Sequence, residues 1–228
     1  MYATQFRFQK SAPIKWRLSW IGWLSIVALQ ICLIATSLRA EGIEAIHIDI
    51  LLRDDASIVV EQVWETNADS GSEFYISLQN LKQMKLRDFW VIGRDGRPFT
   101  ERSPWDLNAS FQAKSGHYGI RSHDGATELC FGQGAYGPNR YTLHYRLENG
   151  VQSFPDRDGF NIRFVNDELT PAPQKIDLRI HLESGQLSPA NSEVYAFGFN
   201  APINFIDGEL RSEIKHFDAS SHVSILLG

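Results

Sequence analysis

Apolar and polar residues alternate along most of the chain beyond residue 40. Within residues 43–53, isoleucines recur at every second position, and Ser57 begins a second alternating run that reaches Glu65. A period of two residues is typical of a strand with one buried face. The turn at residues 54–56 joins the two runs, so this pattern predicts a β-hairpin. We expect its outer face to carry Glu61 and Glu65 and its inner face to carry Val60, Val63 and Trp64.

Further short apolar runs follow at intervals that suit strands, and Asp-Gly and Asn-Gly pairs lie between many of them. Such turn pairs favour hairpins, and many short strands in succession favour two packed antiparallel sheets. The sequence therefore predicts an all-β chain with the fold of an antiparallel β-sandwich. The best helical candidate, residues 79–85, is only a turn or two long. The further predicted strands are residues 73–78, 86–93, 109–113, 118–121, 128–131, 141–147, 160–165, 175–182, 193–199 and 222–227.

One domain is expected over residues 41–228, with a possible internal boundary at residues 171–174. Pro171 and Pro173 interrupt the strand pattern there. The remaining ~55 residues would make a poor independent core, because small domains bury a low fraction of their surface. We therefore prefer a single elongated sandwich to two separate domains.

The N-terminal 40 residues have the pattern of an export signal. Residues 18–38 carry no charge, four basic residues precede them, and the only charged residue directly after them is Arg39. This asymmetry is the positive-inside signature of a signal peptide or an N-terminal transmembrane helix. Ala40 offers a small residue for cleavage, and the uncleaved alternative anchors the chain through residues 18–38. In both cases the remainder is expected to be extracytoplasmic, either secreted or membrane-anchored at the cell envelope.

The charge of the chain argues against nucleic acid as a partner. The whole chain has 22 Lys and Arg against 27 Asp and Glu, a formal net charge of −5. Residues 1–40 contain five of the basic residues and none of the acids, so the remainder has a formal charge of −10. An acidic domain without a basic cluster repels phosphate backbones.

The residues that could carry chemistry do not form a recognisable catalytic or metal-binding set. His117 lies six residues before His123 and Asp124 across a turn, which is not a zinc-ligand spacing. Cys130 is most simply a small buried residue. We therefore expect no enzymatic activity, no cofactor and no metal. An extracellular hydrolase that uses His117, His123 or His216 with nearby acids is the least favoured alternative, and residues 156–159 only superficially resemble a calcium loop.

Aromatic residues suggest a second possible function. Aromatic rings on an exposed sheet face can stack against sugars, whereas buried rings fill the core. A carbohydrate-binding module would use exposed members of a set of four residues: Trp64, Trp90, Trp105 and Tyr136.

Five segments of the chain have the order and spacing of one bacterial family. They are residues 54–61 (DDASIVVE), 116–120 (GHYGI), 128–132 (ELCFG), 139–147 (NRYTLHYRL) and 151–165. Together they resemble the N-terminal extracytoplasmic domain of the YciQ-like predicted bacterial membrane proteins, a domain of unknown function (DUF 2207). The resemblance covers residues 43–228. It implies an exported β-sandwich and supplies no catalytic residues.

Members of that family usually continue into transmembrane helices, whereas this sequence ends at Gly228 without a second hydrophobic span. It is expected to be either a stand-alone variant or a truncated form of a longer membrane protein. The leading hypothesis is a non-enzymatic envelope domain that interacts with an envelope protein or a cell-wall component. A carbohydrate-binding β-sandwich is the alternative.

Overall fold

The computed structural model describes residues 42–228 except 80, 156, 168 and 219. The expected signal peptide or anchor, with residues 18–38 and the cleavage position, lies outside these described residues. Within the described part of the chain, no helix has the length and apolar character that crossing a bilayer requires.

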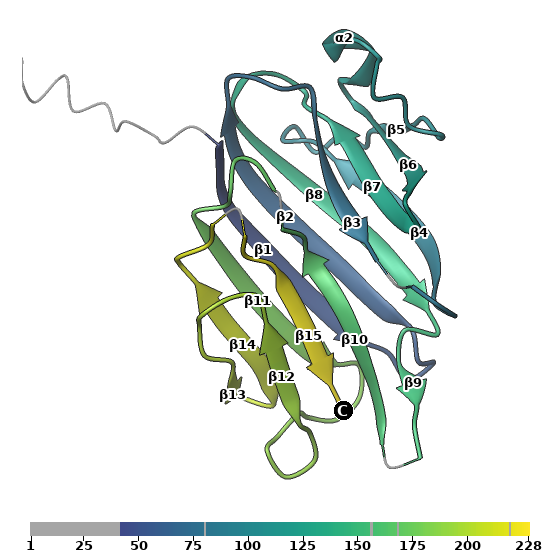
Figure 1. Ribbon diagram of the computed structural model, residues 1–228, viewed down its shortest axis with the longest axis vertical. Helices are drawn as coiled ribbons and strands as arrows, with labels where there is room; N and C mark the ends of the chain where they lie inside the picture. The colour runs from purple at the N-terminus through teal and green to yellow at the C-terminus, as the bar shows by residue number, and fades with distance from the viewer. Residues whose placement is uncertain (1–41, 80, 156, 168, 219) are drawn as a thin grey trace, which may run out of the picture. The chain divides into compact units, whose positions relative to one another are not determined.

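One layer of the fold is a seven-stranded sheet in the order β13-β14-β11-β1-β2-β8-β4 (Figure 1). Its neighbours pair antiparallel except β1 and β11, which pair parallel. The strands are β1 (Gly42–Leu52), β2 (Ile58–Ala68), β4 (Lys85–Ile92), β8 (Gly137–Glu148), β11 (Lys175–Leu182), β13 (Asn204–Ile206) and β14 (Glu209–Ile214).

The opposite layer consists of two four-stranded sheets, and β3 and β10 bring them next to each other. Figure 1 shows both in front of the large sheet. The first has the order β12-β15-β10-β9, and the second β3-β7-β6-β5. The molecule is therefore an all-β sandwich, as predicted. The strands are β3 (Glu73–Leu78), β5 (Thr100–Glu101), β6 (His117–His123), β7 (Ala126–Gly132), β9 (Gln152–Ser153), β10 (Asp158–Val165), β12 (Val194–Phe197) and β15 (Val223–Leu227).

The alternation in the sequence determines which residues fill the space between the layers. Every second residue is buried in β2, in β1 from Ile46 onward and in β8 from Tyr141 onward. These side chains meet buried residues of β3, β7, β10 and β15 in one hydrophobic core. Trp64 on β2 is only 1% exposed and packs against Phe74 on β3 and Phe131 on β7. Aromatic residues of the large sheet thus pack against the opposite layer.

Several predicted turns occupy the left-handed region that two-residue hairpin turns require. Asp124 and Gly125, between β6 and β7, have φ values of 47° and 79°. Asp207 and Gly208, between β13 and β14, have φ values of 52° and 81°. These Asp-Gly pairs therefore set the registers of their hairpins, as their sequence predicts.

Three predictions about local structure are wrong. Residues 109–113 were expected to be a strand, but the short helix α2 (Phe111–Lys114) begins there, because the Ser110 side chain caps it by accepting from the Ala113 amide. The helical candidate at 79–85 contains a turn, and β4 already begins at Lys85. Val63 was expected on the inner face of the hairpin but lies on the outer one, since Gln62 and Trp64 on either side of it are buried.

Candidate binding groove on the outer face of the β12-β15-β10-β9 sheet

Two rows of side chains cross the outer face of the β12-β15-β10-β9 sheet. In the first row, Tyr195 of β12 pairs with Leu226 of β15, which pairs with Asn161 of β10. In the second row, the corresponding residues are Phe197, Ser224 and Arg163. Because side chains alternate along each strand, the residues between them point into the core and these six point outward.

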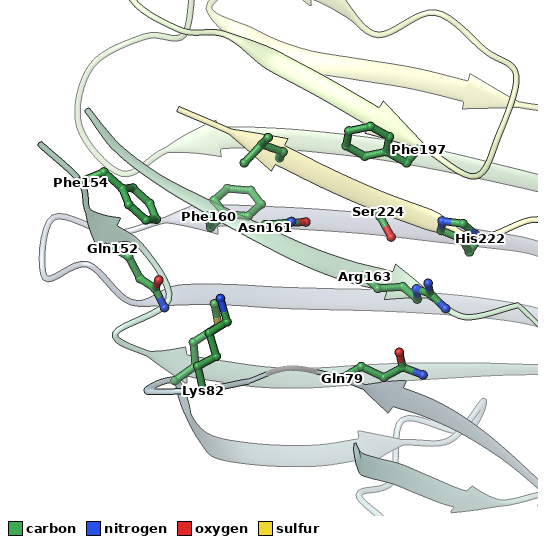
Figure 2. Close-up of a pocket in the computed structure, with 12 residues that line it drawn as sticks. Gln79, Lys82, Gln152, Phe154, Phe160, Asn161, Arg163, Phe197, His222 and Ser224 are labelled. Carbon is green, nitrogen blue, oxygen red and sulfur yellow. The ribbon is translucent and has the colours of Figure 1, made fainter. Parts of the chain in front are cut away.

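A groove of about 390 Å³ lies over this face, beside the chain segment that joins β3 to β4. Figure 2 shows Phe154 near one end of it and His222 and Arg163 near the other. We call it the β10–β15 groove. It is lined by Gln79, Lys82, Met84, Gln152, Phe154, Phe160, Asn161, Arg163, Phe197, His222, Ser224 and Leu226.

Most polar side chains of this groove are not used by the fold. Arg163 donates to Asp167, with 2.7 Å between Nη1 and Oδ1. The side chains of the other polar residues that line the groove make no hydrogen bond or ion pair to any described residue; these are Gln79, Lys82, Gln152, Asn161, His222 and Ser224. Their donors and acceptors are therefore available to a ligand.

Aromatic rings flank these polar groups. Phe154 is 50% exposed and Phe197 is 48% exposed, which is unusual for such apolar side chains. A second depression of about 310 Å³ shares Phe154 and Leu226 with the groove and adds Tyr195, which is 53% exposed. The two depressions together form an extended surface, and such a surface suits a chain-like ligand.

Two glycines allow the close packing on which the groove depends. A Cβ at Gly159 would lie 2.3 Å from the carbonyl oxygen of Leu227, so β10 and β15 approach closely only because this residue is glycine. A Cβ at Gly198 would lie 2.4 Å from the ring of His222. Since Gly198 also has a φ of 87°, the position of the His222 ring depends on that glycine.

Burial lowers the pKa of two histidines of the domain. Desolvation lowers the pKa of His222 below its ordinary 6.5, and the positive charge of Arg163 adds to this effect. Desolvation also lowers the pKa of His144, which stacks on Trp90 with 4.7 Å between the ring centroids. The unfolded chain therefore binds these two protons more readily than the native state does.

We accordingly expect the free energy of unfolding to decrease as the pH falls below 6.5, until both histidines are protonated in the native state too. Protonation of Glu209 lowers the free energy of unfolding further, but only below about pH 4.5, because hydrogen bonds from Arg179 and Arg211 lower the pKa of its carboxyl from 4.5 to about 2. Urea unfolding at a series of pH values measures both windows. In the His144→Gln and His222→Gln variants, the free energy of unfolding should depend less on pH in the histidine range. An unchanged pH dependence in both variants would contradict this explanation.

Two larger depressions differ from the groove because most of their charged side chains are already paired; Glu61 is an exception. One, of about 770 Å³, lies on the outer face of the seven-stranded sheet. There the guanidinium of Arg179 binds Asp49 at 2.8 Å and also binds Glu209, while His47 contacts Asp177 at 2.9 Å. Such cross-strand ion pairs stabilise a solvated sheet face.

The other depression, of about 830 Å³, lies on the outer face of the β3-β7-β6-β5 sheet. Its Arg121 and Glu128 are paired at 2.7 Å, and its Glu73 accepts from the buried ammonium of Lys114 at 3.1 Å. Desolvation raises the pKa of the Cys130 thiol to about 12, so this thiol is protonated at neutral pH and is a poor nucleophile.

The four aromatic residues that the sequence singled out do not form one surface. Trp64 and Trp105 are buried, with 1% and 5% of their surface exposed. Trp90 lies on the outer face of the seven-stranded sheet against His144, and Tyr136 packs on Phe111 of α2. Of the four, only Tyr136 is a largely exposed ring, at 53%.

The histidines considered for catalysis or metal binding have structural contacts. The Nδ1 of His117 lies 2.9 Å from the carbonyl oxygen of Ser115, and His123 lies 3.3 Å from its neighbour Asp124. Asp218, the acid two residues after His216, accepts hydrogen bonds from Ser220 and Ser221. Among the described residues, no group of three or more His, Cys, Asp or Glu side chains could hold a metal ion. Asp156, the first residue of the calcium-like segment, lies outside them.

The residues of the β10–β15 groove were missed by the sequence analysis. A usable signal was the pair Tyr195 and Phe197, which are two residues apart in a strand and therefore share a face. Their neighbours Val194 and Ala196 are the smaller apolar residues that this strand turns inward. An aromatic pair on the outer face of a strand is an indicator of a binding surface.

No protein-family model matches the chain, and no curated protein matches it. The chain aligns with parts of several solved structures, with TM-scores below 0.5. Native leukotriene A4 hydrolase from Saccharomyces cerevisiae aligns with a TM-score of 0.45 and 7% identity over 88% of this chain and 32% of that one. The M1 zinc metallopeptidase from Deinococcus radiodurans aligns with a TM-score of 0.40 and 10% identity, over 83% and 42% of the two chains. An aminopeptidase N family protein from Idiomarina loihiensis aligns with a TM-score of 0.42 and 12% identity, over 80% of this chain and 29% of that one. The chain thus spans less than half the length of each, and the likeness concerns the fold alone.

Proposed function

We propose that this chain is a non-enzymatic binding module of an exported, envelope-associated protein, and that it binds a polysaccharide of the cell envelope in the β10–β15 groove. The observation that carries the proposal is the combination of half-exposed rings and unpaired polar side chains on one sheet face. Sugars present apolar C–H faces and hydroxyl groups together, so they are recognised by aromatic rings and amide or hydroxyl side chains acting together.

The shape of the groove and its polar side chains suit an extended sugar chain. The groove is open along the sheet and continues past Phe154 into the second depression. Gln152 and Asn161 supply amide groups that both donate and accept, as sugar hydroxyls require. Ser224 supplies a hydroxyl group between Phe197 and Arg163, which are its cross-strand partners on the two sides. The export pattern of the first 40 residues supports an envelope location for such a ligand.

Removing both rings tests this proposal directly. We expect the double variant Phe154→Ala/Phe197→Ala to lose affinity for envelope polysaccharide by roughly 30-fold, because covering each half-exposed ring contributes ~1 kcal/mol. Its free energy of unfolding should change by less than ~0.5 kcal/mol per site, since exposed side chains contribute little to stability. Co-sedimentation of the full chain with purified cell-wall polysaccharide measures the affinity.

Tyr136→Ala is the matched control, because it removes a ring of similar exposure that lies outside the groove. Binding that is lost in this variant and kept in the double variant would refute the groove as the site and would favour the Tyr136 surface instead. Retention of an envelope protein, but of no polysaccharide, would show that the ligand is a protein.

A further inference from the structure

The charges that line the β10–β15 groove differ from those of the rest of the domain. Among the twelve described residues that line it there are two cations, Lys82 and Arg163, and no carboxylate. This contrasts with a chain of 27 acidic and 22 basic residues. The described side chains of the groove thus carry two positive charges on an acidic protein, and the carboxylate of Asp167 offsets part of the charge of Arg163. A surface with excess positive charge is electrostatically complementary to an anion.

Lys82 supplies a positive charge that nothing in the described part of the chain neutralises. Its side chain makes no ion pair there, and Figure 2 shows it extending toward the groove below Gln152 and Phe160. An exposed ammonium with three donors binds a carboxylate without any rearrangement of the fold.

Arg163 lies farther along the groove, near His222 (Figure 2). Its Nη1 is held by Asp167 at 2.7 Å, which fixes the guanidinium in place and partly neutralises it. A guanidinium has five donors, so the remaining N–H groups of Arg163 are available to a second carboxylate. The two cations therefore lie at different points of one elongated groove, as a repeating anionic chain requires.

From this arrangement we infer that the ligand is an acidic polysaccharide with repeated carboxylate groups of the uronic-acid type, which Lys82 and Arg163 bind while Phe154 and Phe197 contact its sugar rings. The inference rests on the proposed function and narrows it to one class of polymer. The unpaired amides of Gln152 and Asn161 would bind the hydroxyl groups of the same sugar units.

The decisive comparison uses polymers that differ only in charge. Binding of the full chain, purified in mild detergent, is measured by titration calorimetry with polygalacturonate and with its fully methyl-esterified form, and alginate serves as a second uronate. We expect the esterified polymer to bind at least ~10-fold more weakly at low salt. The difference should shrink as NaCl is raised from about 50 to about 300 mM, because salt screens exposed charges.

Two substitutions connect that difference to the groove. Lys82→Gln should weaken binding of polygalacturonate by about fivefold and leave binding of the esterified polymer unchanged, as expected for one exposed charge contact. Arg163→Gln should act in the same direction. Lys215→Gln is the control, because Lys215 is an exposed lysine, 67% accessible, that pairs with Glu213 outside the groove.

The possible outcomes separate the inference from the proposed function. Equal affinity for the charged and esterified polymers, with both lost in Phe154→Ala/Phe197→Ala, would overturn the inference and leave the proposed function intact. Charge selectivity that persists in Lys82→Gln and Arg163→Gln would also overturn it. If the chain binds none of the uronates, the esterified polymer and purified cell-wall polysaccharide, the inference and the proposed function are both wrong.

Discussion

Replacing Trp64 with alanine is expected to lower the free energy of unfolding by about 3–5 kcal/mol, the range for removing a large buried aromatic side chain. The ring contacts Phe74 and Phe131 at centroid distances of 5.7 and 5.5 Å, so the cavity would open between the two layers. The indole Nε1 also donates to Gln62 at 2.9 Å, and the Gln62 amide donates in turn to the carbonyl oxygen of Phe164 at 3.1 Å. The substitution therefore also removes one partner of a buried polar chain.

Urea unfolding followed by circular dichroism measures this effect. Trp90→Ala is the matched control, because Trp90 is a partly exposed tryptophan that stacks on His144 on the outer face of the large sheet. We expect it to cost only ~1 kcal/mol. An equal decrease in the free energy of unfolding in the two variants would contradict the placement of Trp64 in the core between the two layers.

The second large effect is expected at Lys114, a lysine that is only 3% exposed. Its ammonium donates to Ser72 Oγ at 3.1 Å, to Glu73 Oε1 at 3.1 Å and to the carbonyl oxygen of Leu107 at 2.7 Å. Trp105 donates its indole N–H to the same Glu73 carboxylate. Lys114→Met should lower the free energy of unfolding by ~3 kcal/mol, because it leaves the Glu73 carboxylate largely buried without its cation.

A double-mutant cycle distinguishes lost charge pairing from lost packing. Adding Glu73→Gln to Lys114→Met should recover part of the stability, since the unpaired negative charge is then gone. Lys85→Met, at an exposed lysine of β4, should change stability by less than ~0.5 kcal/mol. Strict additivity of the Lys114 and Glu73 substitutions would argue against a coupled ion pair.

Strands were predictable where a long run of apolar residues alternates with polar ones, as in β1 and β8. The strand β2 was also predicted, although Gln62 takes one of its inward positions, because it is long and follows a clear hairpin turn. The strand β14 was missed because Ser212, a polar residue, takes one of its inward positions and is 7% exposed. The helix α2 was taken for a strand because four residues are too few to establish a helical period, and its only clear signal is the capping residue Ser110.

The candidate site was less predictable than the fold, because exposure depends on tertiary packing that no local pattern records. Trp64 and Trp105 looked suitable for stacking sugars, yet they lie in the interior. Phe154 and Phe197 would be assigned to a core by composition alone, and they are half-exposed. At these positions the packing of the second layer, and not the type of aromatic residue, determines which rings are exposed.

The parallel pairing of β1 with β11 also has a consequence for how the protein is made. Ala45 pairs with Lys175, so one edge of β1 has no partner until the ribosome has added another 130 residues. Until then β1 can pair with β2, but its other edge has no partner. An unpaired edge on a strand rich in isoleucine promotes association with other unfinished chains. Contacts so distant in sequence also make folding slow. A holding chaperone that binds residues 43–52 during synthesis would therefore raise the yield of native protein.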